Sequence, residues 1–224
     1  MFAGASTRED ILESSLYNPA PFKEQRPSVL HEFVRMHPLA TVISQNGETF
    51  NVSHMPVLIE SNSPQLKLVG HIVRKDPQYQ NLRHCYQVLL IFQGPTAYVS
   101  PSLYEDPFSI PTINYIVVHA TGSSKPIDDP SRTLAHLKAL VQHYERLGTN
   151  RWSMSGLPQQ FVTDMLGKIM AFEVTVTGIQ GKFKLSQNRN EVDRMRVMEA
   201  FANETSSPNA DLADWMCRLR RQDP

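Results

Sequence analysis

The stretch Leu39 to Val73, LATVISQNGETFNVSHMPVLIESNSPQLKLVGHIV, decides the fold class. It holds three segments rich in β-branched residues, at 39–44, 49–59 and 66–73, separated by Gln45-Asn46-Gly47-Glu48 and Ser61-Asn62-Ser63-Pro64. β-Branched residues favour strands, whereas Asn, Gly, Ser and Pro favour turns. The stretch therefore predicts a β-meander.

The strand pattern continues along the chain. Further strands are predicted at 86–92, 96–100, 112–121 and 170–179, and the segment after residue 178 runs on to Lys184. Capping residues and apolar spacing predict helices at 28–37, 76–83, 129–148, 158–166, 191–202 and 210–221. Many strands with short turns and late helices predict a mainly β fold with helices (α+β), either a barrel or a sandwich.

Two predicted elements carry a definite burial pattern. In the 129–148 helix, a stripe of Leu134, Leu137, Val141 and Tyr144 predicts the face turned to the core. The 170–179 strand alternates apolar residues with Glu173 and two threonines, which predicts one buried and one exposed face.

Length and composition are those of a globular protein. The chain has 224 residues, of which 41% are hydrophobic and 20% charged, enough for one large domain or two small ones. Residues 1–27 are polar and contain Pro19, Pro21 and Pro27, so they are expected to form an N-terminal tail. We predict a main domain at 28–190 and a C-terminal helical extension at 191–224.

The chain shows no membrane or secretion signal. Its longest apolar run, Val88 to Phe92, is far shorter than a membrane span, and residues 1–10 contain no apolar signal region. Cys85 and Cys217 lie far apart without the spacing of a metal site, so we expect two reduced thiols and no bound metal. A cytoplasmic protein without membrane contact is expected.

The charge balance gives no support to nucleic-acid binding. The chain has 22 Lys+Arg and 22 Asp+Glu, whereas phosphate backbones attract concentrated positive charge. The most basic stretch is 181–197, with five basic residues against two acidic ones. DNA as a partner stays open on this patch alone.

Familiar catalytic signatures are absent, and the histidines are ambiguous. The sequence has no GxSxG, HExxH, P-loop or GxGxxG motif. We expect four histidines, at 31, 37, 136 and 143, to be solvated or capping residues of helices. His54, His71 and His119 lie in strands, where a hydrogen-bonded core role and a functional role are both open.

The segment Gly181-Lys182-Phe183-Lys184-Leu185-Ser186-Gln187-Asn188-Arg189 has the chemistry of an anion site. Lysine and arginine supply charge, while Ser, Gln, Asn and backbone amides supply directed donors, a combination that suits a phosphate. The alternative is an exposed edge strand in which lysines oppose aggregation.

A second cluster surrounds the proline-rich loop 101–111. It places aromatic hydroxyls and an amide on either side of the loop, at Tyr98, Ser100, Pro101, Ser102, Tyr104, Thr112, Asn114 and Tyr115. Such groups would stack against and hydrogen-bond a flat heteroaromatic ring. On these residues alone, ordinary core packing with hydroxyls at the surface is the better explanation.

Several of these motifs together resemble the PaiB-like family of FMN-binding negative transcriptional regulators. The resemblance rests on Tyr17-x-Pro19-x-x-Phe22, Ser53-His54-Met55-Pro56, GHIVRKDPQ at 70–78, FQGPTAYVSPS at 92–102, PTINY at 111–115, GKFKLSQNR at 181–189 and Asp193-Arg194. It covers nearly all of residues 17–200, and GKFKLSQNR is its most specific part.

The resemblance implies a flavin-reductase-like split β-barrel that forms a homodimer and binds FMN near the subunit interface. Residue chemistry and family motif together give the expected cofactor residues: Arg74, Lys182, Lys184, Ser186, Gln187 and Arg189 at the phosphate, and Tyr98, Ser100, Tyr104, Asn114 and Tyr115 near the ring. Thr96, Leu103 and Ile113 stand where the family usually has His, Trp and Trp, so we expect weaker flavin binding or an altered pocket. No catalytic residue is assigned.

Two functions follow from the resemblance. The first is a flavin-dependent dimeric regulator, which needs no catalytic residue. The second is an FMN-dependent oxidoreductase or a haem-handling split-barrel enzyme, in which His54, His71 or His119 would contact haem or substrate. A dimeric scaffold that has lost its cofactor is a third alternative, because of the two missing tryptophans.

Overall fold

The computed structural model describes residues 16–60, 63, 65–84, 87–146, 152–204 and 208–222, which form two compact units. The central unit comprises Pro27–Gln93 and Ala120–Ile179, and the terminal unit comprises the described parts of Met1–Arg26, Gly94–His119 and Gln180–Pro224. Each unit is therefore built from separate chain segments. The division into a 28–190 domain and a 191–224 extension stays a prediction.

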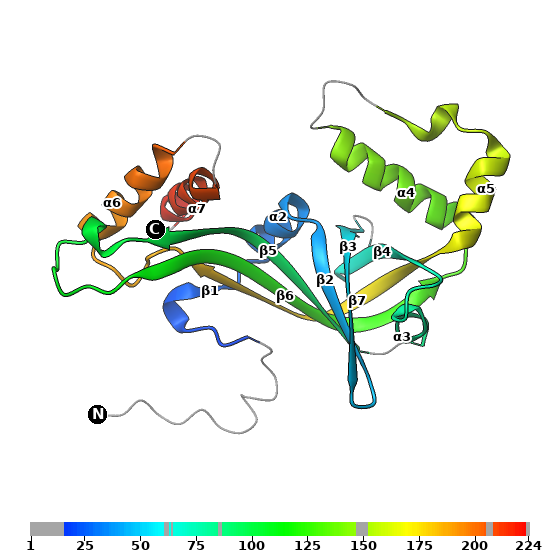
Figure 1. Cartoon of the computed structure of the whole chain (residues 1–224), viewed down its shortest axis with the longest axis horizontal. Coiled ribbons are helices and arrows are strands. Elements are labelled where there is room, and N and C mark those ends of the chain that lie inside the picture. The colour runs from blue at the N-terminus through cyan, green and yellow to red at the C-terminus, as the bar shows by residue number, and fades with distance from the viewer. Residues whose placement is uncertain are drawn as a thin grey trace. The chain divides into compact units, whose positions relative to one another are not determined.

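Three long strands contribute to both units (Figure 1): β5 (Gln87–Val99), β6 (Thr112–Ile127) and β7 (Ile169–Lys184). The central unit also contains α2 (Pro27–Met36), β2 (Leu39–Asn46), β3 (Thr49–Ile59), β4 (Lys67–Val73), α3 (Tyr79–Arg83), α4 (Pro130–Glu145), η3 (Met154–Gly156) and α5 (Gln159–Lys168). The terminal unit adds η1 (Ala20–Phe22), β1 (Lys23–Glu24), η2 (Pro101–Leu103), α6 (Glu191–Ala202) and α7 (Pro208–Gln222).

The strands form an antiparallel sheet in the order β1-β7-β4-β3-β2-β5-β6, and β7 also pairs with β6. That second pairing closes six strands into a ring to which β1 adds as an extra strand. The predicted α+β class is confirmed. The predicted meander is β2–β3–β4, and its first turn contains Gly47 at φ 60°, a conformation that glycine adopts without strain.

Strand β5 corrects one sequence expectation. The predicted break at Gln93-Gly94-Pro95 is wrong, because the strand runs through it. Side chains are buried at 88, 90 and 92 and again at 95, 97 and 99, so the alternation shifts by one residue around Gly94. Glycine and proline here change which residues face inward instead of ending the strand.

Burial follows the expected pattern in α2 but not in β7 or α4. The buried face of α2 is Val29, Leu30, Phe33 and Val34. In β7 every residue from Ile169 to Val174 is buried, so the prediction of an exposed Glu173 is wrong. In α4 the buried residues are Thr133 and His136, while the predicted core residue Tyr144 is 44% exposed.

Two C-terminal helices pack against one another in the terminal unit, and Figure 1 shows them side by side. Helix α6 starts at Asn190, whose side chain accepts a 2.8 Å hydrogen bond from the Asp193 amide, and α7 buries Trp215. Trp215 meets Phe183 of β7 edge to face, with ring centroids 5.5 Å apart. The predicted helix at 191–202 is confirmed, and the last helix begins two residues earlier than expected.

The described parts of the chain contain no helix that is both long and apolar enough to span a membrane. Cys217 is a half-buried free thiol, whereas Cys85 lies outside the described residues, so the prediction of two reduced thiols is tested only in part.

Candidate functional site

The predicted anion segment lies at the end of β7, and its first lysine is already engaged. Lys182 is 8% exposed, and its Nζ donates a 2.9 Å hydrogen bond to the backbone carbonyl of Tyr17. The same Nζ lies 5.3 Å from the ring centroid of Tyr17 and 5.5 Å from that of Tyr115. Lys182 therefore anchors the N-terminal segment, which a charge count alone does not reveal.

Lys184 and Ser186 lie against strand β6. The Lys184 ammonium donates to the Thr112 hydroxyl and stays half-buried. Ser186 and Asn114 are both buried, and their side chains are linked by an Nδ2···Oγ contact of 3.0 Å. Ser186 has φ 64°, and its carbonyl accepts the Arg189 amide at 3.0 Å, so a tight turn follows the strand.

Gln187 stabilises this turn. Its Oε1 accepts a 2.7 Å hydrogen bond from the Leu185 amide, and its Nε2 donates to the Phe183 carbonyl. It also lines a small cavity of about 120 Å³ together with Arg194 and Met216. Both ends of the Gln187 side chain are thus hydrogen-bonded to backbone groups of the strand end, and its role in cofactor binding stays a prediction.

Arg189 covers the ring of Tyr104. The guanidinium carbon lies 4.0 Å from the ring centroid, and Nη1 donates to the Ser109 hydroxyl at 3.2 Å. Tyr104 is 6% exposed, and its buried hydroxyl has no hydrogen-bond partner among the described residues. An unsatisfied buried hydroxyl is costly, so it marks a point where a ligand or water would be stabilised.

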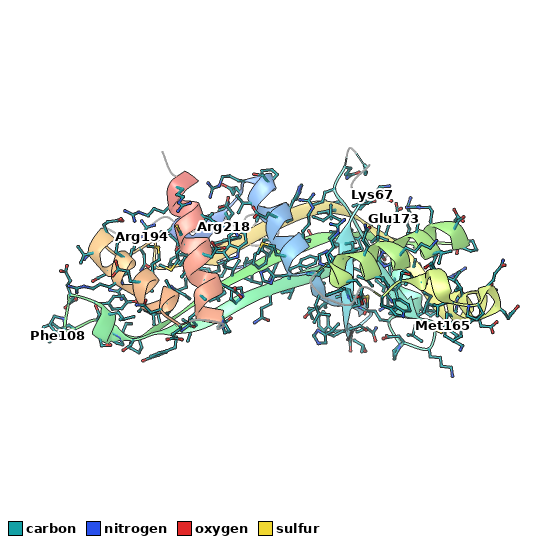
Figure 2. The ribbon with its side chains drawn as sticks, turned by 90° about the horizontal axis from the view of Figure 1, so that it is seen from above. Lys67, Phe108, Met165, Glu173, Arg194 and Arg218 are labelled. Carbon is teal, nitrogen blue, oxygen red and sulfur yellow. The ribbon has the colours of Figure 1, made fainter. Side chains whose placement is uncertain are left out.

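The loop that holds Tyr104 is fixed to α6. Asp193 is 3% exposed and accepts a 2.8 Å hydrogen bond from the Glu105 amide. Further along, Phe108 of the terminal unit, labelled in Figure 2, is 90% exposed.

The predicted ring-binding residues differ in exposure. Tyr98 is 59% exposed on the outward side of β5, whereas Ser100 is half-buried, caps η2 and contacts the Ser102 hydroxyl at 2.8 Å. Thr96, one of the three departures from the family pattern, is exposed on the same side of β5 as Tyr98. Ile113 is 41% exposed on β6, the neighbouring strand.

Arg74 belongs to the central unit, whereas the other ten predicted cofactor residues belong to the terminal unit. Its Nε donates to the Gly167 carbonyl at 3.1 Å and its Nη1 to the Tyr79 hydroxyl at 2.9 Å. In the terminal unit the structure brings together Lys182 with Tyr115, Ser186 with Asn114, and Arg189 with Tyr104.

The central unit holds a charge cluster that the sequence analysis missed. Glu173 is 1% exposed and lies 3.0 Å from both Lys67 Nζ and Lys125 Nζ, and 2.9 Å from Arg132 Nη2; Figure 2 shows Lys67 and Glu173 next to one another. Burial acts to raise the pKa of Glu173, but the hydrogen bonds from the three cations outweigh it and lower that pKa to about 2.

The central unit also contains a pair of histidines in contact, His71 on β4 and His136 on α4. His71 Nδ1 is 3.3 Å from His136 Nε2, and the ring centroids are 5.4 Å apart. Burial, and secondarily His71, lowers the pKa of His136 to about 4, and burial also lowers the pKa of His71. The expectation that His136 is solvated is therefore wrong, because α4 turns it inward.

The other two strand histidines occupy different surroundings. His54 is exposed, and its Nδ1 lies 3.0 Å from the Thr41 hydroxyl, while His119 is half-buried on β6. Within the described part of the chain, no three His, Cys, Asp or Glu side chains gather as a metal site requires.

The donor set of the terminal unit fits a phosphorylated aromatic cofactor. The ammonium of Lys184 and the guanidinium of Arg189 provide positive charge, and the Tyr104 hydroxyl is an unsatisfied donor beside Arg189. Tyr98 offers an exposed ring on the same unit.

Comparison with known proteins gives a family. Residues 16–178 match the family model described as "Putative FMN-binding domain"; the match ends before the 181–189 segment. The chain is 31% identical over 195 residues to the Protease synthase and sporulation protein PAI 2 of Bacillus subtilis, covering 87% of this chain and 93% of that protein.

Solved structures support the fold. The FAD and heme binding protein from Mycobacterium smegmatis matches with a TM-score of 0.54 at 15% identity, covering 72% of this chain and 73% of that one. The flavocytochrome Anf3 from Azotobacter vinelandii matches with a TM-score of 0.55 at 12% identity, covering 85% and 78%. The predicted split barrel is confirmed, and the chain belongs to the PaiB-like family of FMN-binding split-barrel proteins.

Proposed function

We propose that this protein is a homodimeric, FMN-dependent regulator. Membership of an FMN-binding family supports the cofactor, and the similarity to a protease synthase and sporulation protein of B. subtilis supports a regulatory role. The single observation that carries the cofactor proposal is the Arg189 guanidinium over the ring of Tyr104, whose buried hydroxyl has no partner among the described residues. Lys184, the last residue of β7, adds a second cation in the same unit.

The phosphate of FMN is held by Lys184 and Arg189. Both are only half-buried, and their contacts in the chain are to neutral hydroxyls and a ring, so neither charge is neutralised by a carboxylate in those contacts. The end of β7 and the turn after it are stabilised by the side-chain contacts of Lys182, Ser186, Gln187 and Asn114. Arg74, in the central unit, remains a predicted phosphate ligand.

The isoalloxazine ring of FMN lies against the exposed side chain of Tyr98. Tyr98 presents a free aromatic face, and Tyr115 lies beside the Lys182 ammonium. Because Thr96 and Ile113 replace His and Trp at exposed positions, the stacking area is smaller than the family pattern provides. The bound flavin would supply one- and two-electron redox chemistry.

Comparing FMN with riboflavin tests the phosphate assignment, because riboflavin lacks the phosphate. Lys184→Ala should weaken FMN binding by about tenfold, the loss of one charge-assisted contact, and leave riboflavin binding within about twofold. Lys138→Ala, which removes an exposed lysine of α4, is the control. Equal losses for both flavins, or none for FMN, would contradict the assignment.

The dimer forms through an apolar face of the sheet in the central unit. Directly paired residues of β2, β3 and β5 share one side of the sheet. The outward positions are Leu39, Thr41, Ile43, Gln45, Phe50, Val52, His54, Pro56, Leu89 and Ile91.

None of these positions carries Asp, Glu, Lys or Arg, and Leu39, Phe50 and Val52 are 58%, 64% and 53% exposed. A continuous uncharged face of this kind is unusual on a monomer and is typical of a subunit interface, which needs about 800 Å² per partner.

Two matched valines test the dimer. Val52 on the apolar face and Val73 at the end of β4 are 53% and 52% exposed. Val52→Glu should reduce the mass measured by light scattering from about twice the chain's 25.4 kDa to that of one chain, because it would bury a charge at the interface. Val73→Glu should stay dimeric. Dissociation of both variants or of neither would refute this interface.

An FMN-dependent oxidoreductase or haem-handling protein is the second candidate function. The observation in its favour is the His71–His136 pair, because neutral imidazole is the form that ligates haem iron. Haem titration with visible spectroscopy tests it: a Soret shift lost in His136→Ala supports haem handling. No shift with haem and no NAD(P)H oxidation by the FMN-loaded protein would remove this candidate.

DNA is a further proposed partner of the regulator, although the neutral net charge gives it no support. Binding measured at several salt concentrations tests it, and failure at every concentration would exclude direct repression.

A further inference from the structure

A groove lies between helix α4 and strand β3. Two adjoining cavities, of about 430 and 290 Å³, share Leu58, Ile59 and Ala139. The helix residues that line them recur every three or four positions and so form one face of α4: Arg132, Ala135, His136, Ala139, Gln142, His143 and Arg146. We call this space the α4 groove.

Small side chains keep the groove open. Ala135 and Ala139 stand at the centre of the α4 face and are exposed, whereas larger residues there would fill the space toward β3. Its apolar surface is completed by Val57, Leu58, Ile59, Val69 and Ile127. The volumes are close to the range of about 300–1,000 Å³ in which small-molecule sites are found.

The charged residues of the groove are unevenly distributed. Of the charged or titratable residues that the structure describes, the smaller cavity is lined by Arg35, His143 and Arg146 and by no acidic one. The larger cavity has Arg132 and Glu60, which form a 3.0 Å ion pair with each other. The smaller cavity therefore carries uncompensated positive charge, and the larger one is nearly neutral and mostly apolar.

We propose that the α4 groove binds an amphiphilic organic anion, with its anionic group at Arg35 and Arg146 and its apolar body over Leu58, Ile59 and Ala139. Guanidinium groups recognise carboxylate and phosphate oxygens alike. An apolar chain that passes Ala139 enters the larger cavity, where Val69 and Ile127 exclude water from it. This site shares no residue with the proposed FMN site, because neither of its cavities is lined by Arg74 or by any of the other predicted cofactor residues.

Three probes of equal chain length test the charge requirement by isothermal titration calorimetry, each below its micelle concentration: octanoate, octanol and octylammonium. Octanoate should bind saturably, octanol about tenfold more weakly, and octylammonium undetectably, because two arginines repel it. Comparing octyl phosphate with octanoate shows whether the groove prefers a phosphate or a carboxylate. Equal binding of the anion and the cation, or no saturable binding of either anion, would overturn the proposal.

Two substitutions locate the site. Ala139→Phe places a ring in the segment that both cavities share and should weaken octanoate binding by about tenfold or more. Ala202→Phe makes the same change at an exposed helix position of the terminal unit and should have no effect. Arg146→Gln, at an exposed residue, should weaken binding without disturbing packing. Octanoate affinity unchanged in both Ala139→Phe and Arg146→Gln would refute the site, and FMN affinity should be unaffected by either.

Discussion

Replacing Glu173 by glutamine tests how the central unit is held together. Glutamine keeps the shape of the side chain but removes the charge that faces Lys67, Lys125 and Arg132 at about 3 Å. The pKa of Glu173 is lowered from 4.5 to about 2, and one pKa unit corresponds to about 1.4 kcal/mol. The ionised form therefore stabilises the fold by about 3 kcal/mol at pH 7, and water around the partly exposed cations reduces the loss to about 2–3 kcal/mol.

Urea unfolding at pH 7 measures this loss. With a slope of about 3 kcal/mol per molar urea, the midpoint of Glu173→Gln should fall by about 1 M. Because the folded pKa of this acid is depressed, its contribution is present above about pH 4.5 and is lost as the pH falls toward 2, so the difference from the wild type should narrow below pH 4.5.

Glu60→Gln is the matched control for the charge cluster. Glu60 is 31% exposed, and within the described part of the chain its one ion pair is with Arg132, so its loss should cost less than about 1 kcal/mol. A Glu173→Gln loss below 1 kcal/mol, or a difference that does not change with pH, would refute the account of a buried carboxylate stabilised by three cations.

Further predictions concern the histidine pair and the β6–β7 contact. The pKa of His136 in the folded protein is lowered to about 4, so on acidification the unfolded chain binds this proton first, and the free energy of unfolding should fall between about pH 6.5 and 4. In His136→Gln, about 2–3 kcal/mol of this pH dependence should disappear. Urea midpoints measured at pH 7 and pH 4.5 test this. A variant as pH-sensitive as the wild type would contradict this. A Cβ at Gly122 would lie 2.2 Å from the Thr175 carbonyl oxygen, so Gly122→Ala should lower the melting temperature by about 10 °C or more, whereas Gly156→Ala, with no atom within 4 Å, should not change it. Equal melting temperatures for the two alanine variants would show that β6 and β7 do not approach so closely.

The local parts of the fold were predictable from the sequence. Residues 39–59 hold two segments rich in β-branched residues on either side of Asn46-Gly47, and such a local pattern predicts a hairpin. The apolar face of α2 and the Asn190 cap of α6 are likewise encoded within a few residues. In contrast, Gly94-Pro95 has the composition of a turn, yet it lies inside the continuous strand β5, so composition alone predicts the wrong structure there.

The long-range contacts were not predictable. Glu173 stands in a strand that alternates like a half-buried one, and only the distant Lys67, Lys125 and Arg132 make its burial tolerable. His71 and His136 are 65 positions apart, so their contact has no local signal.

The candidate cofactor segment shows the same limit. The sequence identifies Lys182, Lys184 and Arg189 as one basic run. It does not reveal that Lys182 donates a hydrogen bond to the Tyr17 carbonyl, or that Arg189 stacks on the ring of Tyr104. Which of these basic side chains are engaged in contacts within the protein depends on segments that meet only in the folded chain. Which residues bind the phosphate therefore stays a prediction.

FMN binding by a dimer can be measured by titrating the freshly purified wild-type protein with FMN, following the quenching of flavin fluorescence, and determining the mass of the same sample by light scattering. The account predicts saturable binding of FMN by a dimer. A protein that leaves flavin fluorescence unchanged at every concentration would contradict it, and would mean that Thr96, Leu103 and Ile113 have removed the cofactor from a barrel that otherwise keeps the family's fold.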